Sequence, residues 1–370
     1  MKHLYCLSLS FLLLSACATP PKPMPMPPLP LTQKEHIPSP VQAAIKATTF
    51  TIVAVGDIMM GGTALPIMQE QGYDRPFAKT KHLFSHADAV IGNLEGPLST
   101  RGIADKDKKY VFRSPADKVG PALKNAGFDV LTLANNHSLD YGVTALNDTI
   151  DALKQQNLAH IGAGNNLKEA RKPHIMEKNG FKVGFLGYSL TYPEEFWAKD
   201  NRAGTVFGYE HTIRQDIQRL RQQVDSIVVS FHWGREGTTK LRAYQPRLGR
   251  IAIDEGAALV IGHHPHIMQA VERYKHGVIL YSLGNYVFGS YSQRSPYGGI
   301  AQVVLNQHGF AKLTLTPIDT NNFRRHFQPQ PLTGKPLNQA LESIQNLSRL
   351  QHTETIIYNE QLVLQGMPQE

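Results

Sequence analysis

Short apolar runs alternate with amphipathic segments from about residue 49 onward. The apolar runs are rich in β-branched residues, which predicts buried strands, and we expect these at 50–55, 87–92, 130–134, 181–187, 226–232, 257–262, 277–282, 300–306 and 312–317. Apolar residues three and four positions apart predict helices at 115–126, 144–156, 212–223, 246–255 and 336–350. Strand and helix alternate as far as residue 262, and strands predominate after it. This order predicts a layered α/β domain with a mixed sheet or two packed sheets.

The N-terminal residues have a different pattern. A positive start is followed by an apolar stretch, 4–14, that is too short to span a bilayer. Small residues precede Cys17, an arrangement similar to the bacterial lipobox, in which the cysteine is lipidated. Proline recurs through the following segment and predicts an extended tether. We therefore expect a lipoprotein signal peptide (1–17), a proline-rich tether (18–48), a globular domain (49–320) and a C-terminal extension with one helix (321–370).

These features predict a location in the bacterial cell envelope, with the chain held on a membrane by its lipid anchor and facing the periplasm or the exterior. Ala18 stands where many lipoproteins retained at an inner membrane have aspartate. We therefore expect the outer membrane if the host has two membranes.

Cysteine content and charge narrow the function classes. The two cysteines are Cys6 and Cys17, so the domain beyond the signal has none, which excludes a thiol nucleophile, a cysteine zinc site and a disulfide scaffold. The net charge of +8 favours anionic partners. The basic residues form no long block and do not alternate with aromatic residues, so we do not expect nucleic acid as a partner.

Polar residues with metal-ligating groups follow five of the predicted strands. Because ligands gather at the carboxyl ends of strands in open α/β sheets, we expect these residues to lie together: Asp57, Asn93 with Glu95, Asn136 with His137, His232, and the cluster His263, His264 and His266. In extended backbone, His264 and His266 would point the same way. Carboxylate, amide and imidazole ligands suit Mn²⁺, Fe or Zn²⁺. Two ions bridged by one carboxylate would generate hydroxide near neutral pH and clamp an in-line displacement.

Taken together, these motifs resemble the capsule-biosynthesis, CapA-type branch of the calcineurin-like metallophosphoesterases. The resemblance covers about residues 50–290 and rests on Gly56–Met59, Asn93–Gly96, Phe112–Arg113, Leu133–Gly142, His232–Gly234, Gly262–His266 with Gln269, and Tyr281–Phe288. It implies a four-layer α/β/β/α sandwich with a dinuclear metal site between the sheets. It also implies a role in the synthesis or export of a poly-γ-glutamate-like capsule polymer.

The resemblance also implies a role for each site residue. Asp57 and His266 are expected to bind one divalent ion, and the second ion is expected to be bound by Asn136, His232 and His264. Glu95 is our choice for the bridging carboxylate, with Asn93 beside it. His137 follows the pattern in which a histidine stabilises or protonates the reacting group.

The sequence departs from the family pattern at two places. Met59 stands where typical phosphoesterases have a histidine, and Gly92-Asn93 replaces the Gly-Asp pair that usually supplies the bridge. Both changes predict that one metal site has fewer strong ligands. His263 has no ligand role in the match, and we expect it to support a ligand or to lie on the surface.

Other residues in the motif loops have predicted supporting roles. Arg113 and Arg235 are expected to bind an anionic group of the substrate, since a guanidinium matches phosphate or carboxylate, and the alternative is a surface ion pair. Asp140 and Glu236 are expected to orient histidines. Residues 105–109 are charged and predict a solvated loop.

Three functions fit these observations. We favour an envelope-anchored, metal-dependent hydrolase, in which metal-bound hydroxide attacks a phosphoester or related bond in an anionic polymer or phosphorylated substrate. The alternative is a non-catalytic, metal-stabilised binding or assembly subunit that works with other capsule-synthesis proteins. Met59 favours this second function and His137 speaks against it. A nucleic-acid phosphodiesterase, the third, fits poorly with the lipid anchor and the weak basic pattern.

Overall fold

The computed structural model describes residues 49–293 and 296–366. The predicted signal peptide with Cys17 and the predicted tether therefore lie outside the described residues. Within the described ranges, no helix combines the length and the apolar character that crossing a membrane requires.

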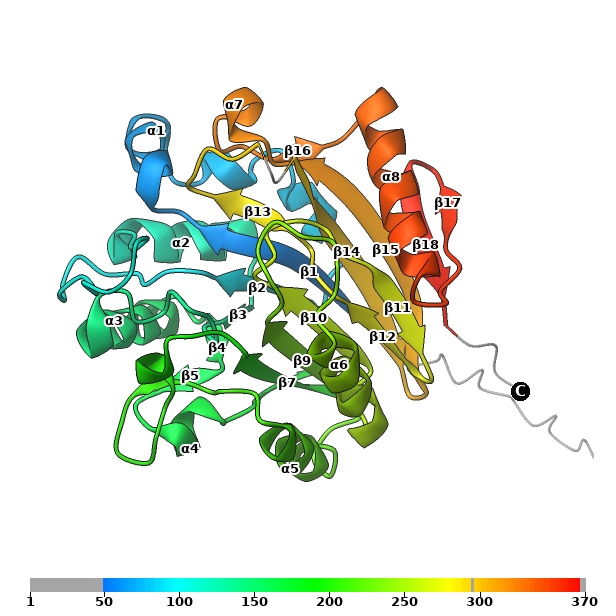
Figure 1. Cartoon of the computed structure of the whole chain (residues 1–370), viewed down its shortest axis with the longest axis horizontal. Helices are drawn as coiled ribbons and strands as arrows, with labels where there is room; N and C mark the ends of the chain where they lie inside the picture. The colour runs from blue at the N-terminus through cyan, green and yellow to red at the C-terminus, as the bar shows by residue number, and fades with distance from the viewer. Residues whose placement is uncertain (1–48, 294–295, 367–370) are drawn as a thin grey trace, which may run out of the picture. The chain divides into compact units, whose positions relative to one another are not determined.

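The larger sheet is mixed, because its strand β1 runs parallel to β2 and antiparallel to β14 (Figure 1). Its main path runs β17-β18-β15-β14-β1-β2-β3-β4, with β13 also paired to β1 and β16 to β15. The ten strands found in the described part are β1 (Phe50–Met59), β2 (Ala89–Leu94), β3 (Val130–Thr132), β4 (Ala159–Ile161), β13 (Asn285–Phe288), β14 (Tyr297–Asn306), β15 (Gly309–Asp319), β16 (Gln330–Pro331), β17 (Ile356–Tyr358) and β18 (Gln361–Gln365).

The smaller sheet has the order β11-β12-β10-β9-β7-β6. Its strands are β6 (His174–Lys178), β7 (Phe181–Ser189), β9 (Ser226–His232), β10 (Leu259–His263), β11 (Val271–Tyr274) and β12 (Gly277–Leu280). Strands β7, β9, β10 and β12 run parallel. A separate two-stranded pair joins β5 (Ala163–Gly164) to β8 (Gly204–Thr205).

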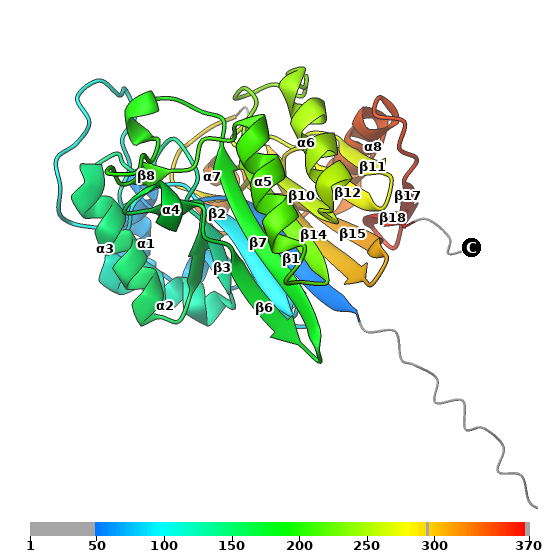
Figure 2. The same cartoon turned by 90° about the horizontal axis from the view of Figure 1, so that it is seen from below.

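Helices cover the outer face of each sheet (Figure 2). The larger sheet is covered by α2 (Ala116–Ala126) and α3 (Gly142–Gln155), and the smaller sheet by α5 (Glu210–Leu220) and α6 (Tyr244–Glu255). The other helical elements are α1 (Leu65–Gln71), α4 (Leu167–Ala170), α7 (Asn322–Arg325), α8 (Gly334–Arg349) and the 3-10 turns η1 (Gly62–Ala64), η2 (Arg75–Phe77), η3 (Lys81–Phe84) and η4 (Glu194–Phe196).

The side-chain alternation along β1 shows why four layers form. Ile52 and Ala54 pack into the core between the two sheets, whereas Val53 and Val55 pack into the core under α2 and α3. Successive side chains of a strand point to opposite faces, so a strand that is apolar on both faces has to be covered on both. The predicted α/β/β/α sandwich is therefore confirmed.

The segment after residue 320 is continuous with the larger sheet. Its helix, predicted at 336–350, is α8, and apolar residues of α8 such as Leu341 and Ile344 join the core between the sheets. Strand β18 pairs antiparallel with β15.

The sheet register brings the polar strand ends together. Asp57 on β1 is in register with Asn93 on β2, and His232 on β9 is in register with His263 on β10. The backbone just before Asp57 packs closely against Gly284. A Cβ added at Gly56 would lie 2.0 Å from the carbonyl oxygen of Gly284. Only glycine allows that contact, so the backbone carrying Asp57 is held against the turn after β12.

Candidate metal centre

Two buried carboxylates form the base of the site. The amide of Asn93 donates to Asp57 Oδ1 at 2.9 Å and to Glu95 Oε2 at 3.1 Å, and all three side chains are fully buried. Asn93 Oδ1 in turn accepts a hydrogen bond from Asn135 Nδ2 at 3.0 Å. Since both ends of the Asn93 amide are engaged, this residue holds the two carboxylates at a fixed spacing.

The predicted imidazole and amide ligands surround these carboxylates. His266 Nδ1 lies 3.1 Å from Asp57 Oδ2, and its Nε2 lies 3.6 Å from Glu95 Oε1. His232 Nε2 lies 2.7 Å from Asn136 Oδ1 and 3.8 Å from Glu95 Oε1. The His264 ring lies 4.7 Å from the His232 ring, measured between centroids. The structure thus brings all six predicted ligands into one cluster.

Two orphaned buried atoms show that this cluster fits a metal. Neither Glu95 Oε1 nor His264 Nδ1 has a hydrogen-bond partner, although both are buried, and such atoms are rare in folded proteins. Ligand atoms within 4.8 Å of one another occur in two groups, Glu95 with His264 and His266, and Asp57 with Glu95 and His232. Glu95 belongs to both groups, which agrees with a bridging position. Oxygen and imidazole donors of this kind suit a divalent transition metal.

The backbone of the histidine cluster differs from the predicted extended form. Strand β10 ends at His263, and His264 and His266 have φ angles of +93° and +58°. L-residues rarely adopt this left-handed region, and such strain is typical of functional sites. The chain turns sharply around Pro265, and this turn, rather than strand alternation, brings both imidazoles to Glu95.

Burial and mutual charge shift the pKa values of these groups in opposite directions. Burial raises the pKa of Glu95 well above its usual value, with help from the charge of Asp57. Burial would also raise the pKa of Asp57, but the close contacts with His263 and His266 outweigh burial and hold the pKa of Asp57 well below normal. Burial lowers the pKa of His264 to about 3, whereas Glu95 and Asp57 overcome burial and raise the pKa of His266 to about 10.

His137 lies beside the candidate metal ligands and lines a pocket. Its Nδ1 lies 2.7 Å from Asp140 Oδ2, which confirms the predicted orienting role of Asp140, and its Nε2 lies 3.9 Å from Glu95 Oε1. Burial lowers the pKa of His137, and Asp140 partly opposes this shift. The pocket has a volume of about 330 Å³ and is lined by His137, His266, Asn285, Glu236, Gly237, Ser290, Ser292 and the aromatic residues Tyr110, Phe112, Phe288 and Tyr291.

Lys108 is a site residue that sequence reasoning missed. The loop 105–109 was expected to be solvated, but the Lys108 side chain is only 15% exposed. Its ammonium group contacts the Asp140 carboxylate and the Asn136 carbonyl oxygen, and it lies 3.3 Å from His137 Nδ1. The Phe112 backbone N–H also donates to Asp140, at 2.7 Å. Asp140 therefore joins this loop to His137.

Replacing Lys108 by methionine is expected to destabilise the fold by about 2 kcal/mol. The buried Asp140 carboxylate would lose its cation, but the Phe112 N–H and His137 would still bind it, so the cost falls below that of a fully broken buried pair. Urea unfolding measures the change. The control is Lys109→Met, an exposed neighbour expected to change the free energy of unfolding by less than about 0.5 kcal/mol. Equal effects of the two substitutions would contradict this role for Lys108.

Met59 and His263 occupy the positions where the sequence departs from the family pattern. Met59 is buried, and its sulfur accepts a hydrogen bond from the Gly61 N–H at 3.3 Å. His263 is also buried, with its Nδ1 3.2 Å from Asp57 Oδ1. The expected supporting role of His263 fits this contact, and the surface alternative is wrong.

The predicted substrate-binding arginines lie away from the pocket lining. Arg113 donates to the Thr100 carbonyl oxygen at 3.3 Å and stacks on the Tyr141 ring at 4.3 Å. Arg235 is exposed and lines a neighbouring pocket. Glu236 forms no hydrogen bond with a histidine in the described structure, contrary to expectation, and acts on His266 through its charge alone.

Comparisons with known proteins agree with the motif resemblance. A family model described as "Bacterial capsule synthesis protein PGA_cap" matches residues 51–290. The chain is 33% identical over 290 residues to the "Capsule biosynthesis protein CapA" of Bacillus anthracis, covering 77% of this chain and 70% of that protein. It is 34% identical over 267 residues to the "PGA biosynthesis protein CapA" of Bacillus subtilis (strain 168), covering 72% of this chain and 70% of that protein.

Among solved structures, the chain is similar to the calcineurin-like phosphoesterase YfkN from Bacillus subtilis, with a TM-score of 0.39 and 13% identity over 83% of this chain and 100% of that one. The family model covers more than half of the chain, and two relatives exceed 30% identity over more than two thirds of it. The chain therefore belongs to the family of bacterial capsule synthesis proteins, PGA_cap.

Proposed function

We propose that this protein is a metal-dependent hydrolase that acts in the synthesis or processing of a poly-γ-glutamate-like capsule polymer. The observation that carries the proposal is the buried cluster of Asp57, Glu95 and the histidine ligands, in which Glu95 Oε1 and His264 Nδ1 have no hydrogen-bond partner. The bond to be cleaved is a phosphoester or a related ester or amide.

The residues of the cluster and those beside it would have separate roles in hydrolysis: six would bind metal ions, and His137, oriented by Asp140, would exchange a proton. Divalent ions held by the six ligands would supply Lewis acidity, lowering the pKa of a bound water and stabilising charge on the reacting group. An ionised carboxylate only accepts hydrogen bonds, so Asp140 fixes the proton of His137 on Nδ1. The Nε2 atom of His137 is then the one that exchanges a proton with the reacting group in the pocket.

The relatives support an anionic polymer as the substrate. The two Bacillus proteins are named for capsule biosynthesis and for PGA biosynthesis. Metal ions bound beside His137 and His266 would give this end of the pocket a positive charge, which would attract the carboxylates of such a polymer. Partner proteins of capsule synthesis would deliver or receive this polymer.

A second candidate is a non-catalytic, metal-stabilised subunit that binds or assembles the polymer machinery. Met59 favours it, because a thioether that accepts a main-chain hydrogen bond replaces a histidine ligand. The engaged amide of Asn93 favours it too, since that side chain takes the place of a bridging carboxylate.

Hydrolysis assays separate the two candidates. The full chain, purified in detergent and loaded with Mn²⁺, Fe²⁺ or Zn²⁺ in turn, is incubated with bis-p-nitrophenyl phosphate, p-nitrophenyl phosphate and oligo-γ-glutamate. We expect cleavage of at least one compound with one metal, and its loss when EDTA removes the metal. Metal-loaded protein that cleaves none of them, yet binds oligo-γ-glutamate, would favour the binding subunit.

We also propose that Cys17 anchors the chain to the envelope, on the outer membrane where the host has two. The lipobox-like sequence before Cys17 supports this proposal. Cells fed a clickable palmitate analogue are expected to label the wild-type chain and not a Cys17→Ser variant, which should leave the membrane fraction. A Cys17→Ser variant that stays in the membrane fraction would exclude this anchor.

A further inference from the structure

One loop borders both the metal pocket and a second pocket. This loop joins β9 to α6, and its residues Glu236 and Gly237 line the pocket of His137 and His266. Other residues of the same loop line a separate pocket of about 460 Å³, namely Arg235, Thr238, Lys240, Leu241, Arg242 and Ala243. The loop is fixed in place, because the Gly237 N–H donates to the Pro265 carbonyl oxygen at 2.9 Å. The two pockets are therefore lined by adjacent residues of one loop.

The second pocket is lined by three cationic side chains. Arg235, Lys240 and Arg242 are exposed, and no described acidic residue lines the pocket. Within the described part of the chain, none of these three side chains forms an ion pair or a side-chain hydrogen bond. Other arginines of the protein are paired, as Arg214 is with Glu210 and Glu255 and Arg250 is with Glu272. No ion pair within the described residues therefore neutralises these three cations, and Glu236, which follows Arg235, lines the adjoining metal pocket instead.

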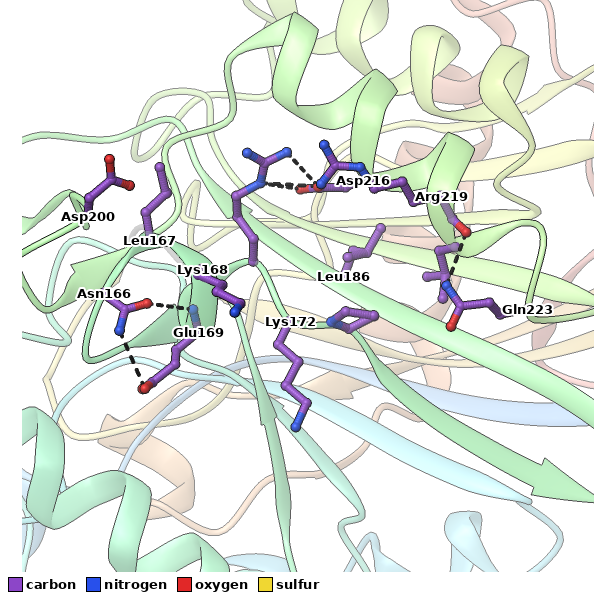
Figure 3. Close-up of a pocket in the computed structure, with 13 residues that line it drawn as sticks. Asn166, Leu167, Lys168, Glu169, Lys172, Leu186, Asp200, Asp216, Arg219 and Gln223 are labelled. Carbon is purple, nitrogen blue, oxygen red and sulfur yellow. Dashed lines mark hydrogen bonds and ion pairs between the residues drawn. The ribbon is translucent and has the colours of Figure 1, made fainter.

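A pocket near α4 and α5 is also lined by basic residues but, unlike the pocket on the β9–α6 loop, contains acidic residues as well (Figure 3). It has a volume of about 800 Å³ and also contains basic residues, including Lys168, Lys172 and Arg219. Three acidic residues line it as well, namely Glu169, Asp200 and Asp216, and the guanidinium of Arg171 is bound to the Asp216 carboxylate. Its charges largely cancel, so basic residues by themselves do not distinguish the pocket on the β9–α6 loop.

We propose that Arg235, Lys240 and Arg242 form an anion-binding subsite that holds carboxylates of an extended polycarboxylate chain, while the adjoining part of that chain occupies the metal pocket. Two guanidinium groups can each bind a carboxylate through paired hydrogen bonds, and the lysine adds a point charge. Repeated carboxylates along a polymer match repeated cations along one loop. The assignment of the metal pocket as the place of cleavage rests on the proposed function, but binding at the subsite does not require cleavage.

Binding of a labelled oligomer tests the subsite. The full chain in detergent is treated with EDTA, so that hydrolysis cannot occur, and its affinity for fluorescein-labelled hexa-γ-glutamate is measured by fluorescence anisotropy at low ionic strength. The triple variant Arg235→Ala/Lys240→Ala/Arg242→Ala is expected to bind about 10-fold more weakly or worse, because it loses three charge contacts. The control Lys168→Ala/Lys172→Ala/Arg219→Ala changes the net charge equally and is expected to stay within about twofold of wild type. Matching thermal unfolding of both variants shows that they are folded.

Three results of these binding measurements would overturn the proposal, and a displacement experiment identifies the bound group. Equal weakening in the two triple variants would show that only the overall charge attracts the oligomer, and unchanged binding in the first variant, or no binding by the wild type, would remove the subsite. Displacement of the label by tripolyphosphate at lower concentration than by unlabelled hexa-γ-glutamate would assign the subsite to phosphate groups instead. If the predicted loss of binding is seen while metal-loaded protein cleaves nothing, the subsite stands and the proposed hydrolase fails.

Discussion

Replacing His264 and His266 together by alanine is expected to reduce strongly the stabilisation of the protein by divalent metal, because one of the two ligand groups loses both of its histidines. These residues provide two of the three ligands in one of the two ligand groups, and a divalent ion left with Glu95 alone there would be held weakly. A ligand that binds only the folded state stabilises it by about 2.7 kcal/mol at a concentration 100 times its dissociation constant. Thermal unfolding with and without added Mn²⁺ or Zn²⁺ should therefore show a rise in Tm for wild type and a clearly smaller rise for the variant, in which only Asp57, Glu95 and His232 remain as a complete group.

The matched control replaces two exposed histidines, His308 and His352, by alanine. It removes the same number of imidazoles from the surface, so it corrects for weak metal binding elsewhere on the chain. The control should retain the full metal-induced rise in Tm. A rise of wild-type size in His264→Ala/His266→Ala would place the metal at other residues.

Replacing His137 by alanine is expected to lower kcat by about 10²–10⁴-fold while the bound metal stays in place. The side chain is held by Asp140 with its Nε2 free to face the pocket, and a positioned proton donor or acceptor typically contributes this factor. The measurement pairs turnover of whichever ester the metal-loaded wild type cleaves with the metal content of the same samples.

The control for His137 is His160→Ala, which removes a half-buried histidine from another pocket. It should leave both kcat and metal content unchanged. If His137→Ala loses activity only in proportion to lost metal, His137 is a structural neighbour of the ligands and takes no part in proton transfer. Full activity in the variant would exclude His137 from the reaction altogether.

The long elements of the fold were predictable from local pattern. Strand β9 was predicted at 226–232 and lies there, since its continuous apolar run admits few alternatives in a sheet buried on both faces. Short strands were missed because they exist only through distant pairing. Strand β13 is one example: Asn285 was recognised as part of a motif, but its parallel pairing with Asp57 depends on contacts 228 positions apart, from 57 to 285.

The clustering of the candidate ligands could be predicted because they share one structural position, the carboxyl end of a strand. The tertiary contacts and the backbone conformation around these residues could not be predicted from the sequence. Lys108 lies in a run of charged residues that is typical of a solvated loop, and only its tertiary contacts with Asp140 and Asn136 make it part of the site. The left-handed backbone of His264 was equally hidden, because no local rule places a histidine there when glycine is the usual choice.

Elemental analysis of the purified full chain, after reconstitution with Mn²⁺, Fe²⁺ or Zn²⁺ and removal of free metal, tests the central claim most directly. If Asp57, Glu95, Asn136, His232, His264 and His266 form a dinuclear centre, the chain should carry about two ions, and His264→Ala/His266→Ala should carry fewer. A metal content no higher than that of the His264→Ala/His266→Ala variant, with each of the three metals, would contradict the claim that this cluster is a metal centre.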